Sequence, residues 1–559
     1  MQISRRDFIK TAGTASALLA ADGFWVAGCT RQSSNNIRMK ELFLLNEDWM
    51  HYLFTRTEEE LDVENLEAFI DQYAGGKVTH LFLNPNGQRA SFRSKSREAL
   101  WDPVPGLTEE ELQNDPNQQV SAHHSLDYIQ ARKNAKILHD KGIDPYEVWI
   151  RRCREKEISP WLSMRMNDVH RADVKTHYFH SEFWRSNPQY WRVPNYTGNY
   201  WFNCALDYAH QAVREHQFTF LEELLERYDP DGIELDWQRG PYNLRSGRFK
   251  EDTHFLDGFV RDTRNLTKKW AARRGHDIGL AVRVPSHPDA AEGFGLNAAR
   301  WAREGWCDMI IAAPYFATSD YDARIDLWRE RIGYATEDVR LLACADVGTQ
   351  AFPGAKFAYH ADNVLWTYYD LPFLYGFIDN ARFRGADGIY LFNWYDNGSK
   401  TPPDGDYRKL LAKGIEAEII RSEERRYPVT YRDIDPGSET KRDVVVDNIQ
   451  LPKETDVAQT IRIPMGSIPK NGSVFLILGF EKRDGLETAT FTASLNGKDL
   501  GQHDDEYELQ RMAAPQRAVK FRVPLASLQA GENMMTLQPT AGTVQRLVWV
   551  ELRVPGFIR

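Results

Sequence analysis

The stretch FTFLEELLERYDPDGIELDW, residues 218–237, decides the fold because it joins a helix to a buried strand. Its first part spaces apolar side chains as one face of a helix does: Phe220, Leu221, Leu224, Leu225 and Tyr228. Its last part, residues 232–237, is a short apolar run typical of a strand covered on both faces. Glu234 and Asp236 interrupt that run, although a buried carboxylate is costly unless it is paired. The stretch therefore predicts one repeat of an α/β fold and raises the question of what the two carboxylates do.

The same alternation of short apolar runs and helical patterns continues through residues 39–425. The predicted strands are Glu41–Asn46, Val78–Asn84, Ser159–Asn167, Gly232–Trp237, Ile278–Val284, Met309–Tyr315, Leu341–Asp346 and Gly388–Trp394. Eight strands that alternate with helices predict an α/β fold of the (β/α)8 TIM-barrel type with enlarged loops. A doubly wound open sheet is the alternative, but no GxGxxG turn accompanies these strands.

Residues 426–559 have a different pattern, of short strands with turn residues between them. The predicted strands lie near 444–446, 460–463, 474–478, 491–495, 519–523 and 546–552. Asn496-Gly497 is a strong hairpin signal. This region is predicted to be an all-β sandwich, jelly-roll-like, that serves as an accessory domain. It either braces the barrel, which we favour, or binds sugar.

The N-terminus predicts export. Residues 4–10, SRRDFIK, match the twin-arginine pattern, and an apolar run follows. Residues 26–29, VAGC, resemble the lipobox of bacterial lipoproteins, which makes Cys29 the expected lipidation site, residues 1–29 the signal and 30–38 a tether. A plain signal peptide is the alternative. No later run is long and apolar enough to span a bilayer, so a lipid anchor is the expected membrane contact, on the periplasmic or cell-surface side.

Composition excludes some classes of partner. The net charge is −10, which argues against a nucleic-acid partner. The 5 cysteines form no CxxC pair, so neither a zinc site nor a disulfide framework is predicted. His170, His177 and His180, with His123 and His124, match no common metal-ligand spacing. We expect no metal and no cofactor; oligomeric state is left open.

Strand parity divides the barrel residues into two sets. The outward set is apolar in all eight strands and includes Tyr390 and Phe392 in the last one. The inward set at the carboxyl ends is polar: Asn46, Asp48, Asn84, Asn86, Arg165, Asn167, Glu234, Asp236, Arg283, Tyr315, Asp346 and Asn393. A barrel that needs only stability fills these layers with Val, Ile and Leu, so a ligand site is predicted. The alternative is a polar plug in which Glu234 pairs with Arg165 and Arg283, and we favour that role for Glu234 alone.

The catalytic candidates follow from position. Asp236, at the end of the fourth strand, is directed into the cleft and is predicted to be a nucleophile or general base. Glycoside chemistry needs a second carboxylate, for which Asp346 is the first choice. Its competitors are Glu47, Asp48, Asp168 and Asp396. The predicted substrate-binding residues are Asn84, Asn86, Arg165, Asn167, Asp168, His170, Glu234, Arg283, Tyr315, Asn393 and Trp394.

The loop after the third strand is rich in aromatic residues. Between His177 and Tyr208 lie Tyr178, Phe179, Phe183, Trp184, Tyr190, Trp191, Tyr196, Tyr200, Trp201 and Phe202. About half of them are expected to form the loop's own core. Exposed aromatic faces at a barrel mouth suit stacking on sugar rings, so this loop favours a glycan ligand.

Three segments resemble bacterial glycosyl-hydrolase-like barrel proteins: LDYAHQAVREHQFTFLEELLERYDPDGIELDW (206–237), LNAARWAREGWCDMIIAAPY (296–315) and ARFRGADGIYLFNW (381–394). The resemblance implies that Asp236 is the active-site carboxylate and that the substrate is a glycan. The chain departs from the family pattern at Glu234, where relatives often have a neutral residue or His, and at Trp237, where many have a second Asp. We therefore expect an exported glycosidase. The alternatives are a non-catalytic glycan-binding lipoprotein and a polysaccharide lyase that uses Tyr315 beside Arg283.

Overall fold

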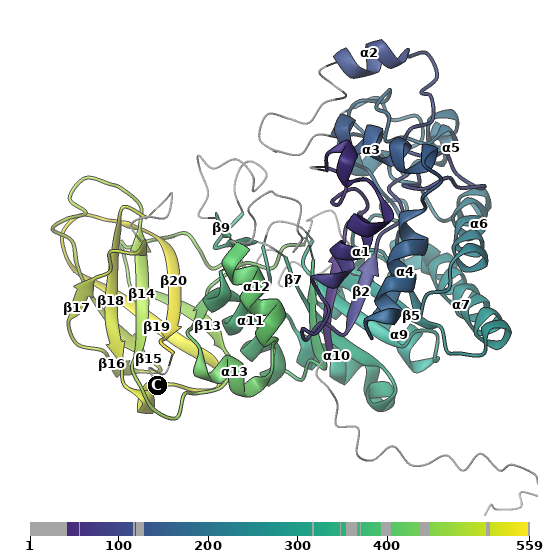
Figure 1. Ribbon diagram of the computed structural model, residues 1–559. Helices are drawn as coiled ribbons and strands as arrows, with labels where there is room; N and C mark the ends of the chain where they lie inside the picture. Colours follow the sequence, from purple (N-terminus) through teal and green to yellow (C-terminus); the bar gives the residue numbers. More distant parts are fainter. Residues whose placement is uncertain are drawn as a thin grey trace, which may run out of the picture. The chain divides into compact units, whose positions relative to one another are not determined.

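The computed structural model describes residues 42–54, 56–115, 118, 128–198, 200–315, 318–346, 348–353, 366–368, 370–392, 404–434, 448–509 and 515–556 (Figure 1). The predicted signal, tether and Cys29 lie outside these residues, as do Asn393, Trp394 and Asp396. Among the described helices, none combines the length and the apolar character needed to cross a bilayer.

The first part of the described chain is a closed parallel barrel. Its strands are β1 (Leu42–Glu47), β2 (His80–Leu83), β3 (Ser159–Arg165), β4 (Gly232–Asp236), β5 (Gly279–Pro285), β6 (Met309–Ala313), β7 (Arg340–Ala345) and β10 (Gly388–Leu391). Around the barrel they follow the order β1-β10-β7-β6-β5-β4-β3-β2. The predicted TIM barrel and all eight of its strands are confirmed.

Helices follow the strands as the alternation predicted. The helices of the barrel are α1 (Val63–Asp71), α3 (Tyr128–Asp140), α4 (Pro145–Glu155), α6 (Gln211–Arg227), α7 (Phe249–Arg274), α8 (Pro288–Gly293), α9 (Ala298–Arg303), α10 (Ile325–Ile332), α11 (Leu371–Phe383) and α12 (Asp404–Lys413). Short helices α2 (Glu109–Asn114), α5 (Glu182–Ser186) and α13 (Ala417–Ser422) lie in connections, and β8 (Gly348–Gln350) pairs with β9 (Trp366–Tyr368) after β7. Helix α6 buries the apolar face predicted for it, including Phe220, Leu221 and Leu224, against the barrel core.

The floor of the barrel is a single large side chain. Trp161 on β3 is 4% exposed and stacks on Phe82 of β2, with ring centroids 5.1 Å apart. The next two strands around the barrel, β4 and β5, carry glycine at the same level: a Cβ added at Gly232 would lie 2.4 Å from the indole, and one at Gly279 would lie 2.5 Å from it. These glycines are therefore required by space, because the indole fills the volume that two side chains would occupy.

The register predicted for the eighth strand is wrong. Tyr390 and Phe392 belong to the cluster inside the barrel, with Leu44, Phe82 and Trp161, whereas Ile389 and Leu391 pack under the helices. All four residues are apolar or aromatic, so hydrophobicity alone does not distinguish the two faces of this strand. The consequence is functional, since Tyr390 and Phe392 now contact the polar layer.

The second part is a β-sandwich, as predicted. One sheet has the order β11-β20-β14-β18-β17, with β12 on β20, and the other has the order β13-β19-β15-β16. Their strands are β11 (Arg425–Pro428), β12 (Lys453–Glu454), β13 (Gln459–Met465), β14 (Val474–Phe480), β15 (Thr490–Leu495), β16 (Lys498–Asp499), β17 (His503–Asp505), β18 (Arg517–Val523), β19 (Gly531–Ala541) and β20 (Arg546–Val554). The Asn496-Gly497 turn joins β15 to β16, with positive φ at both residues. The strand predicted near 444–446 lies outside the described residues.

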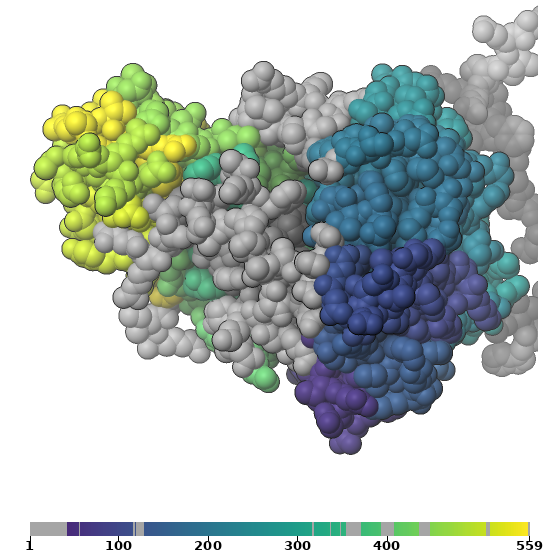
Figure 2. All heavy atoms as spheres, turned by 90° about the horizontal axis from the view of Figure 1, so that it is seen from above, coloured from purple at the N-terminus to yellow at the C-terminus, as the bar shows by residue number. Residues whose placement is uncertain are grey.

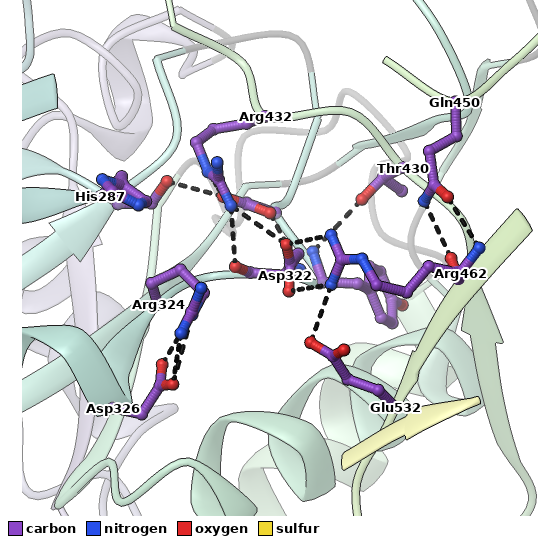
Figure 3. A network of polar contacts seen from close by, with 12 residues as sticks. His287, Asp322, Arg324, Asp326, Thr430, Arg432, Gln450, Arg462 and Glu532 are labelled. Atoms are coloured by element: carbon purple, nitrogen blue, oxygen red, sulfur yellow. Dashed lines mark hydrogen bonds and ion pairs between the residues drawn. The ribbon is translucent and has the colours of Figure 1, made fainter. Parts of the chain in front are cut away.

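Barrel and sandwich share a buried ion-pair cluster (Figure 3). The carboxylate of Asp322, before α10, binds Arg384 at 2.7 Å, Arg432 at 3.1 Å and Arg462 at 2.6 Å. Arg462 comes from β13 of the sandwich and also reaches Glu532 at 3.1 Å. Because three cations surround a carboxylate that is 4% exposed, the charge is compensated where water is excluded. This cluster fits the bracing role favoured for the sandwich.

The barrel floor yields a stability prediction. Gly232→Ala places a methyl group against the Trp161 ring, and we expect it to destabilise the protein by about 1–3 kcal/mol, as overpacking does. The matched control is Gly258→Ala in α7, where the added Cβ meets nothing closer than 3.9 Å. Thermal unfolding should show a lowered midpoint for Gly232→Ala and an unchanged or raised one for Gly258→Ala. Equal midpoints for the two variants would refute the role given to Trp161.

Candidate functional site

Asp236 ends β4 at the carboxyl edge of the barrel and is 1% exposed. Its Oδ1 accepts hydrogen bonds from Arg283 Nη1 at 2.9 Å and from the backbone N–H groups of Gln238 and Arg239, both at 3.1 Å. Among the described residues, none donates to Oδ2. One oxygen is thus fixed by a cation and by the turn that follows β4, while the other is left for a ligand. Capping of the turn after β4 therefore accounts for the first oxygen only.

Glu234 lies one layer deeper on the same strand and is fully buried. Its Oε1 accepts hydrogen bonds from the hydroxyl groups of Ser163 on β3 and Tyr390 on β10, the latter at 3.1 Å. Its Oε2 has no hydrogen-bond partner among the described residues. The predicted pairing of Glu234 with Arg165 and Arg283 is wrong, because both arginines form their ion pairs with other carboxylates.

Burial and the neighbouring charge of Asp236 raise the pKa of Glu234 to about 8. The hydrogen bonds from Ser163 and Tyr390 and the charge of Arg283 oppose this shift but do not overcome it. The two carboxyl groups on β4 therefore have different surroundings. Burial and a neighbouring carboxylate raise the pKa of Glu234, whereas Asp236 has a paired cation.

Arg283 of β5 connects these groups. Its guanidinium lies 3.9 Å from the centroid of the Phe392 ring and makes a cation–π contact with it, while Nη1 binds Asp236. Burial opposes its charge, but Asp236 more than compensates and holds the pKa of Arg283 above its usual value. Nε and Nη2 have no acceptor among the described residues. Arg283 is therefore a cation that binds Asp236 and has two further N–H groups that can donate to a ligand.

A second polar cluster links the loops after β1, β3 and β4. Arg165 at the end of β3 binds Asp168 at 2.8 Å and also binds Asp48. Asp168 in turn contacts His170 Nδ1 at 3.0 Å, and Nε2 of that ring lies 3.1 Å from Arg239 Nη2. Burial favours the neutral carboxyls, yet these cationic and imidazole neighbours hold the pKa values of Asp48 and Asp168 well below their usual range. Both are therefore poor candidates for a proton donor.

Three predicted binding residues are used by the protein itself. Asn167 donates to the carbonyl groups of Leu206 and Tyr242, at 2.8 and 3.0 Å, and accepts from the Leu206 N–H at 2.9 Å. Asn86 donates to the Gly87 and Arg165 carbonyl groups, at 2.6 and 3.2 Å. Asn84 donates to the Ser163 carbonyl, although its Oδ1 takes no donor among the described residues. These amides position the loops around Asp236.

Asp346 and Tyr315 lie at the same edge of the barrel. Asp346 directly follows β7, is 1% exposed and is tied to Ser319, whose hydroxyl exchanges hydrogen bonds of 3.0 Å with its backbone N–H and C=O. Tyr315 follows β6; its N–H donates to the Asp433 carbonyl at 3.0 Å and its ring contacts Phe202, with centroids 5.7 Å apart. The predictions for these two residues stand as proposals.

The aromatic loop divides as expected. Tyr178, Phe179, Trp184, Trp191 and Phe202 are buried, Phe183, Tyr190, Tyr196 and Trp201 are half-buried, and Tyr200 is 46% exposed. The segments that follow β2 and β3 cover one side of the face seen from above (blue in Figure 2). Half of the loop's aromatic side chains are therefore buried, Phe183, Tyr190, Tyr196 and Trp201 pack half-buried against the same core, and Tyr200 is the most exposed of the ten.

Sequence reasoning missed Ser163, Tyr390, Phe392 and Arg239. Ser163 and Tyr390 fix Glu234, Phe392 supports Arg283, and Arg239 links Asp236 to His170. The sequence contained a signal for two of these residues. Ser163 has the inward parity of the third strand, and Arg239 follows the segment DGIELDW closely. In the described part of the chain, no group of three or more His, Cys, Asp or Glu side chains is placed to hold a metal ion.

Arg165 yields a prediction with a defined pH dependence. A depressed carboxyl pKa contributes stability that is present above the unfolded value, about 3.9, and lost as pH falls through the folded value. Arg165→Met leaves Asp48 and Asp168 without their shared cation, which we expect to cost about 3–5 kcal/mol at pH 7. The loss of unfolding free energy should be smaller at pH 4. At that pH, Asp48 and Asp168 of the variant can take up protons more easily, which removes their unpaired charges.

Thermal unfolding at both pH values measures the effect. Arg151→Met is the control, since Arg151 is half exposed and its partner Glu67 lies at the surface of α1; a pair of this kind contributes about 0–1 kcal/mol. A loss for Arg165→Met that is equal at pH 7 and pH 4, or no larger than that of the control, would contradict the assignment.

No protein-family model matches the chain, and no curated protein matches its sequence. Several solved structures have a low similarity to the chain. The cycloisomaltooligosaccharide glucanotransferase of a Paenibacillus species is 8% identical, with coverage of 91% of this chain and 57% of that one and a TM-score of 0.31. A GH36 α-galactosidase of Geobacillus stearothermophilus is 12% identical, with coverage of 90% and 55% and a TM-score of 0.32. The glycoside hydrolase domain of PgaB from Bordetella bronchiseptica is 11% identical, with coverage of 66% and 98% and a TM-score of 0.37. The chain spans little more than half the length of the first two, and the likeness is one of fold.

Proposed function

We propose that the protein is a glycoside hydrolase that cleaves a polysaccharide or oligosaccharide by a two-carboxylate mechanism. The observation that carries the proposal is the arrangement of Asp236: Oδ1 is fixed by Arg283 and two backbone N–H groups, and Oδ2 has no donor among the described residues. A carboxylate held in this way at the carboxyl end of a barrel strand is suited to attack an anomeric carbon or to activate a water. Asp236 is the proposed nucleophile or general base.

The second carboxylate of the mechanism is proposed to be Asp346. In the barrel order β5 and β6 lie between β4 and β7, so Asp346 comes from a strand that is not adjacent to that of Asp236. Asp48 and Asp168 are locked by Arg165, and Glu234 is a neighbour of Asp236 on the same strand. We therefore propose Asp346, which follows β7, as the carboxylate that acts with Asp236 on the scissile bond.

Donors and acceptors around Asp236 suit sugar hydroxyl groups. Arg283 offers Nε and Nη2, while Asn84 and Gln238 offer side-chain carbonyl oxygens, and none of these atoms has a partner among the described residues. Tyr200 and the half-buried aromatic residues of the loop after β3 are proposed to stack on neighbouring sugar rings. The substrate is thus proposed to be a glycan bound across the carboxyl ends of the strands.

The place of action is proposed from the N-terminal sequence. The twin-arginine pattern and the lipobox-like residues 26–29 support export and attachment through a lipid on Cys29. The protein would then meet its glycan on the periplasmic or cell-surface side of a membrane. We expect the wild-type protein to incorporate radiolabelled palmitate in cells and the Cys29→Ser variant not to incorporate it.

A glycan panel with matched variants tests the function. Purified wild-type protein should release reducing ends from at least one glycan, and Asp236→Asn should lower kcat by at least about a hundredfold, the minimum for a group that transfers a proton. Asp140→Asn, at the surface of α3, should leave kcat unchanged, and circular dichroism should show both variants folded.

Three outcomes would overturn the proposal. Full activity of a folded Asp236→Asn protein removes Asp236 from the mechanism. Binding of a glycan without turnover identifies a glycan-binding protein on the same barrel, and products that absorb in the ultraviolet as unsaturated uronates identify a lyase.

A further inference from the structure

We infer that Glu234 is a positioning residue that holds a proton beside the catalytic carboxylate, so that strand β4 carries one negative charge and Asp236 carries it. The inference deepens the function proposed above, on which its catalytic meaning rests. Glu234 and Asp236 occupy alternate positions of one strand, so both side chains point into the barrel. The two carboxyls must therefore share the cations available there.

Only one cation within ion-pair distance serves this pair among the described residues. Arg283 binds Asp236 at 2.9 Å, and no Lys, Arg or His of the described chain forms an ion pair with Glu234. Arg165, the other arginine at this level, is committed to Asp48 and Asp168. Two carboxyls and one cation leave one carboxyl without compensation, and the buried one is neutralised most readily by a proton.

The hydrogen bonds of Glu234 agree with a neutral group. Both partners of Oε1, Ser163 and Tyr390, are hydroxyls, which can donate or accept, and Oε2 has no donor among the described residues. An ionised carboxylate in the same place would present a bare, fully buried oxygen. A protonated carboxyl avoids that cost and leaves the charge of Arg283 to Asp236.

The groups that face Glu234 come from five strands. They are Ser163 on β3, Asp236 on β4, Arg283 on β5, Cys344 on β7 and Tyr390 on β10. Burial raises the pKa of Cys344 to about 12 and that of Tyr390 well above 10, so both stay neutral in the physiological range. The protonation of Glu234 therefore depends on the balance between Asp236 and Arg283. When Asp236 loses its charge, Arg283 needs another counterion and Glu234 should ionise.

Infrared difference spectroscopy of the purified protein tests the inference directly. Wild-type protein should show the C=O stretch of a protonated carboxyl at pH 7, and this band should disappear with a midpoint near pH 8. Glu234→Gln should lack the band. Asp236→Asn should move its midpoint to lower pH, because repulsion is removed and Arg283 is released. Tyr390→Phe, which removes a hydrogen bond to the charged form, should move the midpoint to higher pH.

Thermal unfolding provides a second readout that does not depend on activity. The stability that a protonated Glu234 contributes is present below its unfolded pKa, about 4.3, declines as pH rises and is lost above the folded pKa. The difference between the thermal unfolding midpoints of Glu234→Gln and wild type should therefore rise in favour of the variant between pH 5 and pH 8. Above pH 8 this difference should level off. In kinetics, Glu234→Gln should lose the change in the pH profile of kcat near pH 8 that wild-type protein shows.

The outcomes separate this inference from the proposed function. The inference would be overturned if the wild-type spectrum at pH 7 contained no protonated-carboxyl band that disappears in Glu234→Gln. This result would count whether or not a glycan is hydrolysed. The same holds for a midpoint that Asp236→Asn leaves unchanged. Conversely, absence of hydrolysis across the glycan panel would overturn the proposed function but would not affect the proton on Glu234.

Discussion

The ion pair between Asp236 and Arg283 is the interaction around which the polar half of the barrel is arranged. A charge inside a barrel needs a partner, and each cation there has a defined one: Arg283 serves Asp236, and Arg165 serves Asp48 and Asp168. Glu234 is the carboxyl for which no cation is left. We infer its neutrality from the pairing of both arginines with other carboxylates rather than from its own hydrogen bonds. The chemistry proposed for the mouth therefore depends on where two guanidinium groups are held.

Packing inside the barrel and contacts with the sandwich surround this polar half. Trp161 fills the floor because Gly232 and Gly279 leave it room, and Phe392 supports Arg283 from within the barrel. Outside the barrel, Asp322 and three arginines tie the loop after β6 to the sandwich. In this account the accessory domain braces the side of the barrel that carries β6 and β7, which is also the side of Asp346. Binding of sugar by the sandwich is not needed to explain these contacts.

Most of the fold could be predicted from the sequence, because its signals are local. Buried parallel strands are short apolar runs, and the Asn496-Gly497 turn has no other common structural use. Strand β19 was missed, since it turns Asn533, Met535 and Leu537 to the core within a polar stretch. The register of β10 was wrong because residues on both faces are apolar. Parity placed Glu234, Asp236 and Arg283 on the inward face of the barrel, but it could not predict which carboxylate each arginine would bind. That choice depends on side-chain reach across neighbouring strands, and hence the pairing predicted for Glu234 was wrong.

A neutron crystal structure at neutral pH is the most direct test of this account, because it locates the proton on which the charge balance depends. The account predicts a deuterium atom on the carboxyl of Glu234 and none on that of Asp236, with a fully deuterated guanidinium at Arg283. A deuterium atom on Asp236, or an ionised Glu234 in contact with Arg283, would contradict the claim that β4 carries a single negative charge at Asp236.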